Sequence, residues 1–266
     1  MLEKLSLDGR VVIVTGGGTG LGKAMVLDLA RAGADVVVAA RRPGPIQETA
    51  REVEALGRRA LAISTDVTDS RQVNAMVART LEHFGRVDVL INNAGLGGHG
   101  QVPIWDVTDE QWRHGIDVNL TGAFYCARAV AKHMVERGKG KIINVASGYG
   151  LRGGRDVFMY CAGKGGTIQL TRALAISLGR YGVTANCIVP GYIPTEGAAA
   201  MGDALPRADF VPTGRLGRPE DLGPIAVFLA SDASDYMNGE IFTADGGGLA
   251  GGFAPTGYAP NIPLSL

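Results

Sequence analysis

Two side chains four residues apart, Tyr160 and Lys164, are the pair in this sequence whose spacing most directly suggests chemistry. On a helix, that spacing places both residues on one face. A free phenol has a pKa near ~10, and a nearby ammonium group favours the phenolate and lowers that pKa. The pair could then exchange a proton with a hydroxyl or carbonyl group. Ser147, thirteen residues before Tyr160, could hold the same substrate oxygen, whereas a solvated helix face is the alternative for the pair.

A glycine-rich stretch, TGGGTGLGK over Thr15–Lys23, is the second candidate site. A turn of this kind at a helix start presents backbone N–H groups to a pyrophosphate. Gly17 and Gly22 followed by lysine also fit most of a nucleoside-triphosphatase loop. The next residue is Ala24, however, where that loop needs a Ser or Thr hydroxyl for Mg²⁺. The stretch therefore favours a dinucleotide over a nucleoside triphosphate, and a tight turn without a ligand is the alternative.

The elements that must position these residues alternate between short apolar runs and longer helical patterns. The expected strands are Arg10–Val14, Asp35–Ala40, Arg59–Thr65, Val87–Asn92, Lys141–Ser147, Val183–Val189 and Ile241–Asp245. The expected helices are Lys23–Arg31, Gln47–Leu56, Ser70–Phe84, a long one around Trp112–Arg137, Tyr160–Arg180 and Glu220–Ala230. Runs of Val and Ile without alternation are typical of strands buried on both faces. The sequence thus predicts an α/β protein with a doubly wound parallel sheet, the Rossmann fold, of about seven strands.

Composition narrows the class of protein further. The chain has 266 residues and no linker, so we expect one domain over 1–266, with a substrate lid at about 196–215 and a glycine-rich tail at about 246–266. The 26 basic and 26 acidic residues cancel, which argues against nucleic acid as a partner. Neither a membrane span nor a signal-peptide core is present, so we expect no membrane partner and a cytoplasmic location. The three cysteines lie far apart without a CxxC pair, and we expect no metal site.

Further motifs join these candidates in a fixed order. NNAG (Asn92–Gly95) follows the fourth expected strand, and PGYIPT (Pro190–Thr195) follows the sixth. Together with the glycine-rich stretch, Asp66, Asn119, Ser147 and YCAGK, they make the chain resemble the classical short-chain dehydrogenase/reductase family from Thr15 to Gly246. The likeness is closest to the gluconate/glucose dehydrogenase and 3-oxoacyl-carrier-protein reductase branches. It implies an NAD(P)-dependent oxidoreductase that interconverts a secondary alcohol and a ketone, usually as a homotetramer.

The resemblance also assigns residues to roles. It implies that Asn119, Ser147, Tyr160 and Lys164 are catalytic, with Lys164 on the nicotinamide ribose and Asn119 holding a water. For Asn119, a residue that caps or kinks the long helix is the alternative. The expected cofactor-binding residues are Gly16, Thr19, Gly20, Leu21 and Gly22 in the turn, Asp66 and Val67 at the adenine, Asn93, Ala94 and Gly95 on the adenosine side, Tyr160 and Lys164, and Pro190, Gly191, Ile193 and Thr195 at the nicotinamide.

The end of the second expected strand bears on the choice between NAD and NADP. In Rossmann folds an acidic residue there holds the ribose 2′-OH of NAD, whereas an Arg accommodates the 2′-phosphate of NADP. This chain has Arg41 and Arg42 and no carboxylate before Glu48. We therefore expect NADP(H), read mainly by Arg41 with help from Arg42. Two arginines on a solvated loop are the alternative, and Thr19 stands where some NADP-preferring relatives carry a second basic residue.

The substrate side is less specific. The loops after the fourth, fifth and sixth strands offer His99, Tyr149, Arg152 and Tyr192 as candidate substrate-binding residues. Arg152 could bind a carboxylate or phosphate, and His99 could bind substrate, and for each of them a solvated surface residue is the alternative. These polar candidates favour a small-molecule sugar, sugar acid or polyol. A 3-oxoacyl-thioester reductase and a non-catalytic dinucleotide-binding protein are the alternatives.

Overall fold

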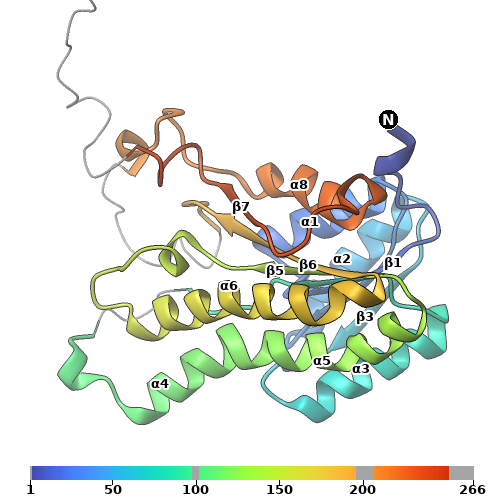
Figure 1. Cartoon of the computed structure of the whole chain (residues 1–266), viewed down its shortest axis with the longest axis horizontal. Helices are drawn as coiled ribbons and strands as arrows, with labels where there is room; N and C mark the ends of the chain where they lie inside the picture. Colours follow the sequence, from blue (N-terminus) through green and yellow to red (C-terminus); the bar gives the residue numbers. More distant parts are fainter. Residues whose placement is uncertain (1, 98–101, 196–206, 252–266) are drawn as a thin grey trace, which may run out of the picture.

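Seven parallel strands form a single sheet at the centre of the molecule (Figure 1). The computed structural model describes residues 2–97, 102–195 and 207–251. The strands are β1 (Val11–Thr15), β2 (Asp35–Ala40), β3 (Ala60–Ser64), β4 (Val89–Asn92), β5 (Gly140–Val145), β6 (Val183–Pro190) and β7 (Ile241–Ala244). Their spatial order is β3-β2-β1-β4-β5-β6-β7, and every neighbouring pair is parallel. The predicted doubly wound parallel sheet is confirmed.

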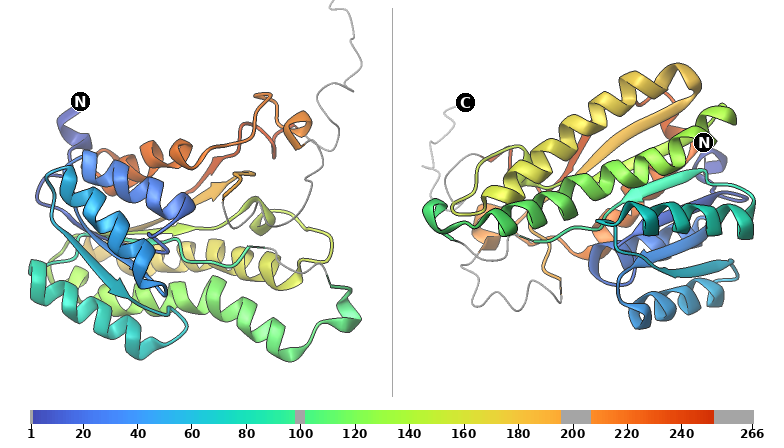
Figure 2. Two further views of the ribbon diagram at one scale, coloured as in Figure 1. Left: turned by 180° about the vertical axis from the view of Figure 1, so that it is seen from behind. Right: turned by 90° about the horizontal axis from the view of Figure 1, so that it is seen from below.

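Helices cover both faces of this sheet (Figure 2). On one face lie α1 (Gly20–Arg31), α2 (Pro43–Ala55) and α8 (Gly223–Ala230). On the other lie α3 (Ser70–Phe84), α5 (Gly122–Glu136) and α6 (Phe158–Leu178). Successive strand residues point to opposite faces, so in β1 Val12 and Val14 pack with α1 and α8 whereas Ile13 packs with α3 and α5. This two-sided burial explains the uninterrupted apolar runs.

The long helix predicted around Trp112–Arg137 is interrupted. It consists of α4 (Asp109–Ile116), a five-residue π-helical segment (Asp117–Thr121) and then α5. The hydroxyl of Thr108 caps the start of α4 by accepting from the N–H of Gln111, whose side chain caps in return. The predicted helix Glu220–Ala230 likewise begins as a 3₁₀ turn, Pro219–Leu222, before α8. Hydrophobic spacing alone does not distinguish these windings, because all of them keep the same apolar side inward.

The described end of the predicted lid contacts the described start of the tail. Of the predicted lid, residues 196–206 lie outside the described part, and a 3₁₀ helix, Arg207–Phe210, follows. Of the tail, only residues 246–251 are described. There Gly246 and Gly247 have φ of 65° and 88°, and the N–H of Thr213 donates to the Gly246 carbonyl at 3.2 Å. The first glycines of the tail thus let this backbone turn tightly against residues 211–213.

Candidate active site

The carboxyl ends of β1 and β4 lie side by side at the point where the strand order reverses. Such a switch point is where open α/β sheets bind their ligands. The hydroxyl of Thr15, the last residue of β1, accepts from the N–H groups of Asn93 and Ala94, at 3.1 Å each. The side-chain amide of Asn93 donates to the carbonyls of Thr15 at 2.9 Å and Gly16 at 3.3 Å. The NNAG motif therefore holds the glycine-rich turn in place.

The glycine-rich turn is built for close approach. Gly16 and Gly20 have φ of 67° and 54°, a region that residues with a Cβ rarely adopt. A Cβ on Gly22 would lie 2.1 Å from the Gly16 carbonyl oxygen, so the turn closes only without a side chain there. α1 begins at Gly20, and neither a Thr19 side-chain cap nor an acidic residue occupies its first turn. Its first N–H groups thus keep their positive potential for an anion, which fits a dinucleotide pyrophosphate.

The segment after β6 lies against the glycine-rich turn at the carboxyl ends of the strands, the place where open α/β sheets have their ligand crevice. A Cβ on Gly20 would meet the Thr195 methyl carbon at 3.1 Å, so Thr195 lies over the turn. Gly191 passes so close to Asp245 that a Cβ would lie 2.6 Å from the Asp245 Cα. Ile193 is buried at the edge of the α1 face. The PGYIPT motif is therefore brought next to the glycine-rich turn, as the resemblance requires.

Ser147, Tyr160 and Lys164 meet beside the same crevice. Ser147 follows β5, and Tyr160 and Lys164 lie one turn apart near the start of α6. The Lys164 ammonium donates to the Val145 carbonyl at 2.9 Å and lies 5.9 Å from the centre of the Tyr160 ring. A Cβ on Gly95 would lie 3.1 Å from the Lys164 Nζ, so the backbone of the NNAG motif also reaches this point.

Burial governs the protonation of this cluster. Lys164 is fully enclosed, and desolvation lowers its pKa to about 8. Burial also raises the pKa of Tyr160, and a hydrogen bond from Ser147 opposes that rise. The sequence predicted that the ammonium would lower the phenol pKa. Instead, in the protein alone, Lys164 bonds to the backbone of Val145 and burial of the phenol dominates.

Asn119 lies inside the π-helical segment, and its side chain is committed to the backbone. Its amide nitrogen donates to the Gly115 carbonyl at 3.0 Å, and its oxygen accepts from the Leu96 N–H at 3.1 Å. These bonds match the helix-distorting alternative that the sequence left open. They also tie the loop after β4 to the helix, with the Asn119 oxygen 3.0 Å from where a Gly95 Cβ would stand.

A buried polar chain connects this segment to the sheet. The Asn92 amide donates to the Asn144 side-chain oxygen, and the Asn144 amide donates to the Thr171 hydroxyl, each at 2.9 Å. Thr171 donates to the Thr167 carbonyl at 2.9 Å, and the Thr167 hydroxyl donates to the Asn119 carbonyl at 2.8 Å. The chain fixes β4, β5, α6 and the π-helical segment relative to one another.

The loops after β2 and β3 hold the residues that the sequence predicts to discriminate the cofactor. Arg41 follows β2 and is exposed, and its carbonyl accepts from the Ser64 hydroxyl at 2.9 Å. Arg42 occupies the N-cap position of α2. Burial alone would raise the pKa of Asp66, but bonds from Thr68 and the charge of Arg41 hold it below its usual value. Arg41 and Asp66 therefore lie near one another.

Val67 packs at the same end of the crevice. It is buried, and a Cβ on Gly122 would lie 2.7 Å from its methyl carbon. The start of α5 thus packs closely against the loop after β3, which keeps Val67 in place.

A small cavity of about 190 Å³ lies beside Tyr160. It lies between the loop after β4, α4 and the start of α6, and is lined by Leu96, Gly97, Val102, Gln111, His114, Gly115, Asn119, Val157, Met159 and Tyr160. The residues of α4 in this list, and Met159, were missed by the sequence analysis, because only the packing of α4 on α6 brings them here. The predicted substrate residue His99 lies outside the described residues.

The other substrate candidates are described. The ring of Tyr149 meets Tyr160 edge-on, with centroids 6.1 Å apart. The Arg152 guanidinium lies over the Tyr149 ring, 5.6 Å from its centroid, and no carboxylate pairs with it within the described chain. Arg155 on the same loop is paired with Asp156 at 3.3 Å. The carbonyl of Tyr192 accepts from the Gly217 N–H at 3.1 Å.

Comparison with known proteins identifies the family. Residues 10–205 match the short chain dehydrogenase family model. The fold and the site define a dinucleotide-binding oxidoreductase, and the chain belongs to the short-chain dehydrogenase family. The predicted family resemblance is thereby confirmed.

Relatives from several branches cover nearly the whole chain. It is 39% identical to the (2S)-[(R)-hydroxy(phenyl)methyl]succinyl-CoA dehydrogenase subunit BbsD of Thauera aromatica, covering 91% of this chain and 98% of that one. It is 39% identical to the 2-dehydro-3-deoxy-D-gluconate 5-dehydrogenase of Escherichia coli K12, covering 94% and 99%. It is 37% identical to a 3-oxoacyl-[acyl-carrier-protein] reductase of Synechocystis, covering 91% and 98%.

A solved structure agrees with this grouping. The gluconate 5-dehydrogenase of Burkholderia cenocepacia in complex with NADP and tartrate superimposes with a TM-score of 0.88 at 36% identity, covering 94% of this chain and 98% of that one. The chain is therefore a family oxidoreductase that uses a nicotinamide dinucleotide and acts on a small-molecule substrate.

The described residues offer neither a membrane-spanning helix nor a metal-binding cluster. No helix among them is both long and apolar enough to cross a membrane. No group of three or more His, Cys, Asp or Glu side chains in the same part of the chain could hold a metal ion.

Proposed function

We propose that the protein is an NADP(H)-dependent dehydrogenase that interconverts a secondary alcohol and a ketone, with Tyr160 as general acid and base. One observation carries the proposal. Ser147, Tyr160 and Lys164 converge next to an uncapped helix N-terminus that suits a pyrophosphate. A non-catalytic dinucleotide-binding protein would not need a hydroxyl, a phenol and an ammonium gathered at one point.

The residues of the cluster have different roles in the reaction. The bound cofactor supplies or accepts the hydride. In reduction, the Tyr160 hydroxyl protonates the carbonyl oxygen, and in oxidation the phenolate takes the proton from the alcohol. The Ser147 hydroxyl donates a hydrogen bond to the same substrate oxygen. Lys164 keeps positive charge near the phenol and would hold the nicotinamide ribose, and Asn119 orders the backbone beside it.

The remaining candidate residues would each bind a different part of the cofactor. Backbone groups of Gly16, Thr19, Gly20, Leu21 and Gly22 would hold the pyrophosphate. Arg41, with Arg42, would bind the 2′-phosphate, because no carboxylate follows β2 to hold a free 2′-OH. The adenine and adenosine would lie against Asp66, Val67, Asn93, Ala94 and Gly95. The nicotinamide would lie against Pro190, Gly191, Ile193 and Thr195. The gluconate 5-dehydrogenase with bound NADP supports this choice of cofactor.

For the substrate we favour a sugar acid or another hydroxy acid. The Arg152 guanidinium pairs with no carboxylate of the described residues, and it lies over the Tyr149 ring, which itself packs against Tyr160. It would bind a carboxylate in a bidentate manner. Tyr149, Tyr192 and His99 are the further candidate contacts. Arg152→Gln should therefore raise the KM for gluconate without changing the KM for an uncharged polyol. The 3-oxoacyl-thioester relatives keep thioester reduction as the second candidate.

Tyr160→Phe tests the proposal most directly. Phenylalanine keeps the ring that packs edge-on against Tyr149 and removes only the hydroxyl. General acid–base catalysis contributes a factor of ~10²–10⁴, so turnover should fall by that much. The dissociation constant for NADPH, followed by fluorescence, should change little.

Tyr181→Phe is the matched control and should keep normal turnover, because it removes an exposed phenol hydroxyl that follows the far end of α6. Normal turnover in the Tyr160→Phe protein would overturn the catalytic assignment.

A further inference from the structure

A second polar hollow lies at the end of the sheet opposite the candidate active site. Its volume is about 520 Å³, within the usual range for small-molecule sites. It is formed by the turns before β5 and β6 and by the segment between α8 and β7. Its lining residues are Gly138, Lys139, Gly140, Lys141, Gly179, Gly182, Thr184, Asp235, Tyr236 and Asn238. We call it the amino-end hollow, and none of its residues takes part in the proposed reaction.

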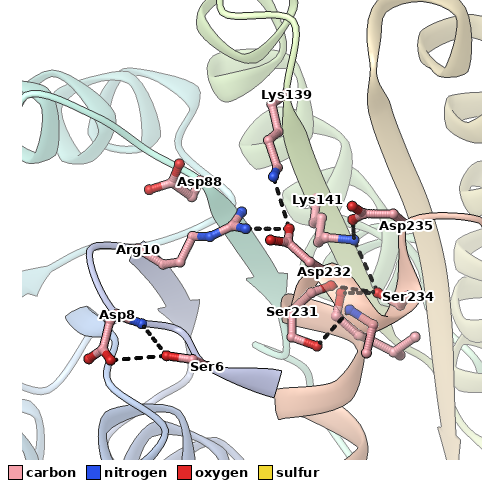
Figure 3. A network of polar contacts seen from close by, with 12 residues as sticks. Ser6, Asp8, Arg10, Asp88, Lys139, Lys141, Ser231, Asp232, Ser234 and Asp235 are labelled. Carbon is pink, nitrogen blue, oxygen red and sulfur yellow. Dashed lines mark hydrogen bonds and ion pairs between the residues drawn. The ribbon is translucent and has the colours of Figure 1, made fainter. Parts of the chain in front are cut away.

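Lys141, the second residue of β5, brings a buried charge to this hollow. The residue is only 3% exposed. Its ammonium donates to the Ser234 hydroxyl at 3.1 Å and pairs with Asp235 at 2.8 Å (Figure 3). An ammonium has three donors, and within the described chain no further acceptor takes the third. Lys141 therefore retains hydrogen-bonding capacity on the hollow side of the sheet.

Thr184 adds a second incompletely bonded group. It pairs with Lys141 across β5 and β6, so the two side chains lie beside each other on one face of the sheet. Its hydroxyl is buried and has no hydrogen-bond partner among the described residues. Buried hydroxyls are rarely left without a partner. An unused hydroxyl and an incompletely used ammonium thus line the same space.

The charges around the hollow favour an anion. On the rim, the Lys139 ammonium pairs with Asp232 at 2.9 Å, and Asp232 is shared with Arg10 (Figure 3). Lys139, Lys141 and Arg10 carry three positive charges against the two carboxylates of Asp232 and Asp235. Asp235 is 55% exposed, so water screens its charge, whereas Lys141 is shielded.

From this arrangement we propose that the amino-end hollow binds a small oxyanion, either a phosphate or a carboxylate group. The Lys141 ammonium and the Thr184 hydroxyl donate to it, and Lys139 supplies charge at the rim. The site is about as far from the chemistry as the sheet allows, since it lies at the amino ends of strands whose carboxyl ends carry Ser147 and the PGYIPT motif.

Isothermal titration of the full chain with inorganic phosphate tests the proposal. The protein is saturated with NADP⁺ and carries Arg152→Gln, so that anion sites in the cofactor crevice are filled and the candidate carboxylate site on the substrate side is removed. We expect one saturable phosphate site per chain. Thr184→Val should weaken it at least ~tenfold, which corresponds to about 1.4 kcal/mol. This variant should fold normally, because valine suits a strand and removes only an unbonded hydroxyl. Acetate in place of phosphate separates a general carboxylate site from a phosphate-specific one.

Lys132→Met provides the charge control, because Lys132 is exposed on α5 outside the hollow. It should leave phosphate binding unchanged, whereas Lys139→Met should weaken it. Two results would overturn the proposal. One is the absence of saturable binding of either anion to the protein that carries only Arg152→Gln. The other is equal weakening by Lys132→Met and Thr184→Val, which would indicate only diffuse surface attraction.

Discussion

Arg41 and Lys164 are two cations of one crevice in opposite environments. Arg41 is exposed at the end of β2, whereas Lys164 is enclosed between β5 and α6. Sequence motifs located both of them and the cluster of Ser147 and Tyr160, because short local patterns mark those positions. They did not locate Gln111, His114 and Met159, whose place beside Tyr160 depends on helix packing. The motifs also predicted a lowered pKa for Tyr160, whereas burial raises it in the protein alone. The spacing of Tyr160 and Lys164 does not indicate how deeply the phenol is buried.

Arg41→Asp should reverse the cofactor preference. The substitution removes the group proposed to bind the 2′-phosphate and puts a carboxylate where NAD-dependent Rossmann folds carry one. We expect the dissociation constant for NADPH to rise roughly tenfold or more, in line with the loss of a charge-assisted hydrogen bond. NADH binding should hold or improve. Arg42→Asp is the adjacent control and should have the smaller effect, and equal losses for both cofactors in Arg41→Asp would refute the assignment.

Lys164 should give the protein a pH-dependent stability. Its folded-state pKa of about 8 is below that of an unfolded lysine, so the unfolded chain binds its proton more tightly. The resulting penalty on the free energy of folding is fully present below pH 8. It disappears as the pH rises toward the pKa of the unfolded lysine. From the shift we estimate about 3 kcal/mol.

The stability of Lys164→Met relative to wild type should therefore be greatest at pH 7 and decline by pH 10. Urea unfolding of the cofactor-free protein at both values measures it. The exposed Lys132→Met supplies the baseline, and a difference between Lys164→Met and wild type that does not vary with pH would contradict the assignment.

At the scale of elements, the interrupted helix positions the site. The sequence predicted its extent, but not that five residues would wind as a π-helix around Asn119. That winding depends on tertiary bonds, from the Thr167 hydroxyl and the Leu96 N–H, which come from distant parts of the chain. Glycines on α6 make the contact possible, because a Cβ on Gly163 would lie 2.8 Å from the Asn119 Cβ.

Two glycines on α6 offer a matched test of this contact. Gly163→Ala should destabilise the protein and lower turnover, because the new methyl group would push Asn119 out of position. Gly165→Ala meets only the Gly150 carbonyl oxygen, at 3.6 Å, which is ordinary contact. It should stabilise the protein by roughly 0.5–1 kcal/mol through helix propensity alone. Chemical denaturation and kcat for both variants decide the matter, and similar behaviour of the two would argue against a role for this contact.

At the scale of the whole molecule, the parallel sheet of about seven strands and the covering of both its faces followed from the sequence. Alternating apolar and helical segments of ordinary length admit few arrangements once crossovers must be right-handed. The sequence could not reveal the amino-end hollow, because its lining comes from two turns and a segment that lie far apart along the chain.

Apolar side chains on the outer surface of α5 and α6 bear on assembly. Phe124 is 42% exposed and Ile176 is 85% exposed, and Arg128 lies over the Phe124 ring. We propose that this surface joins copies of the chain in a homotetramer. Light scattering should then give about four times the mass of one chain, and the double change Phe124→Glu with Ile176→Glu should give smaller species that remain folded. A monomeric wild-type protein would refute the proposal.

The strand order also has a consequence for synthesis on the ribosome. β4 completes its pairing with β1 as soon as residue 92 has emerged, but its other edge waits for β5, at residues 140–145, and β5 in turn waits for β6. A partly made chain therefore displays an open, apolar strand edge of the kind that pairs with other chains. Translation pauses or truncations between residues 92 and 190 should thus favour aggregation, and the nascent protein should depend on chaperones most strongly in that interval.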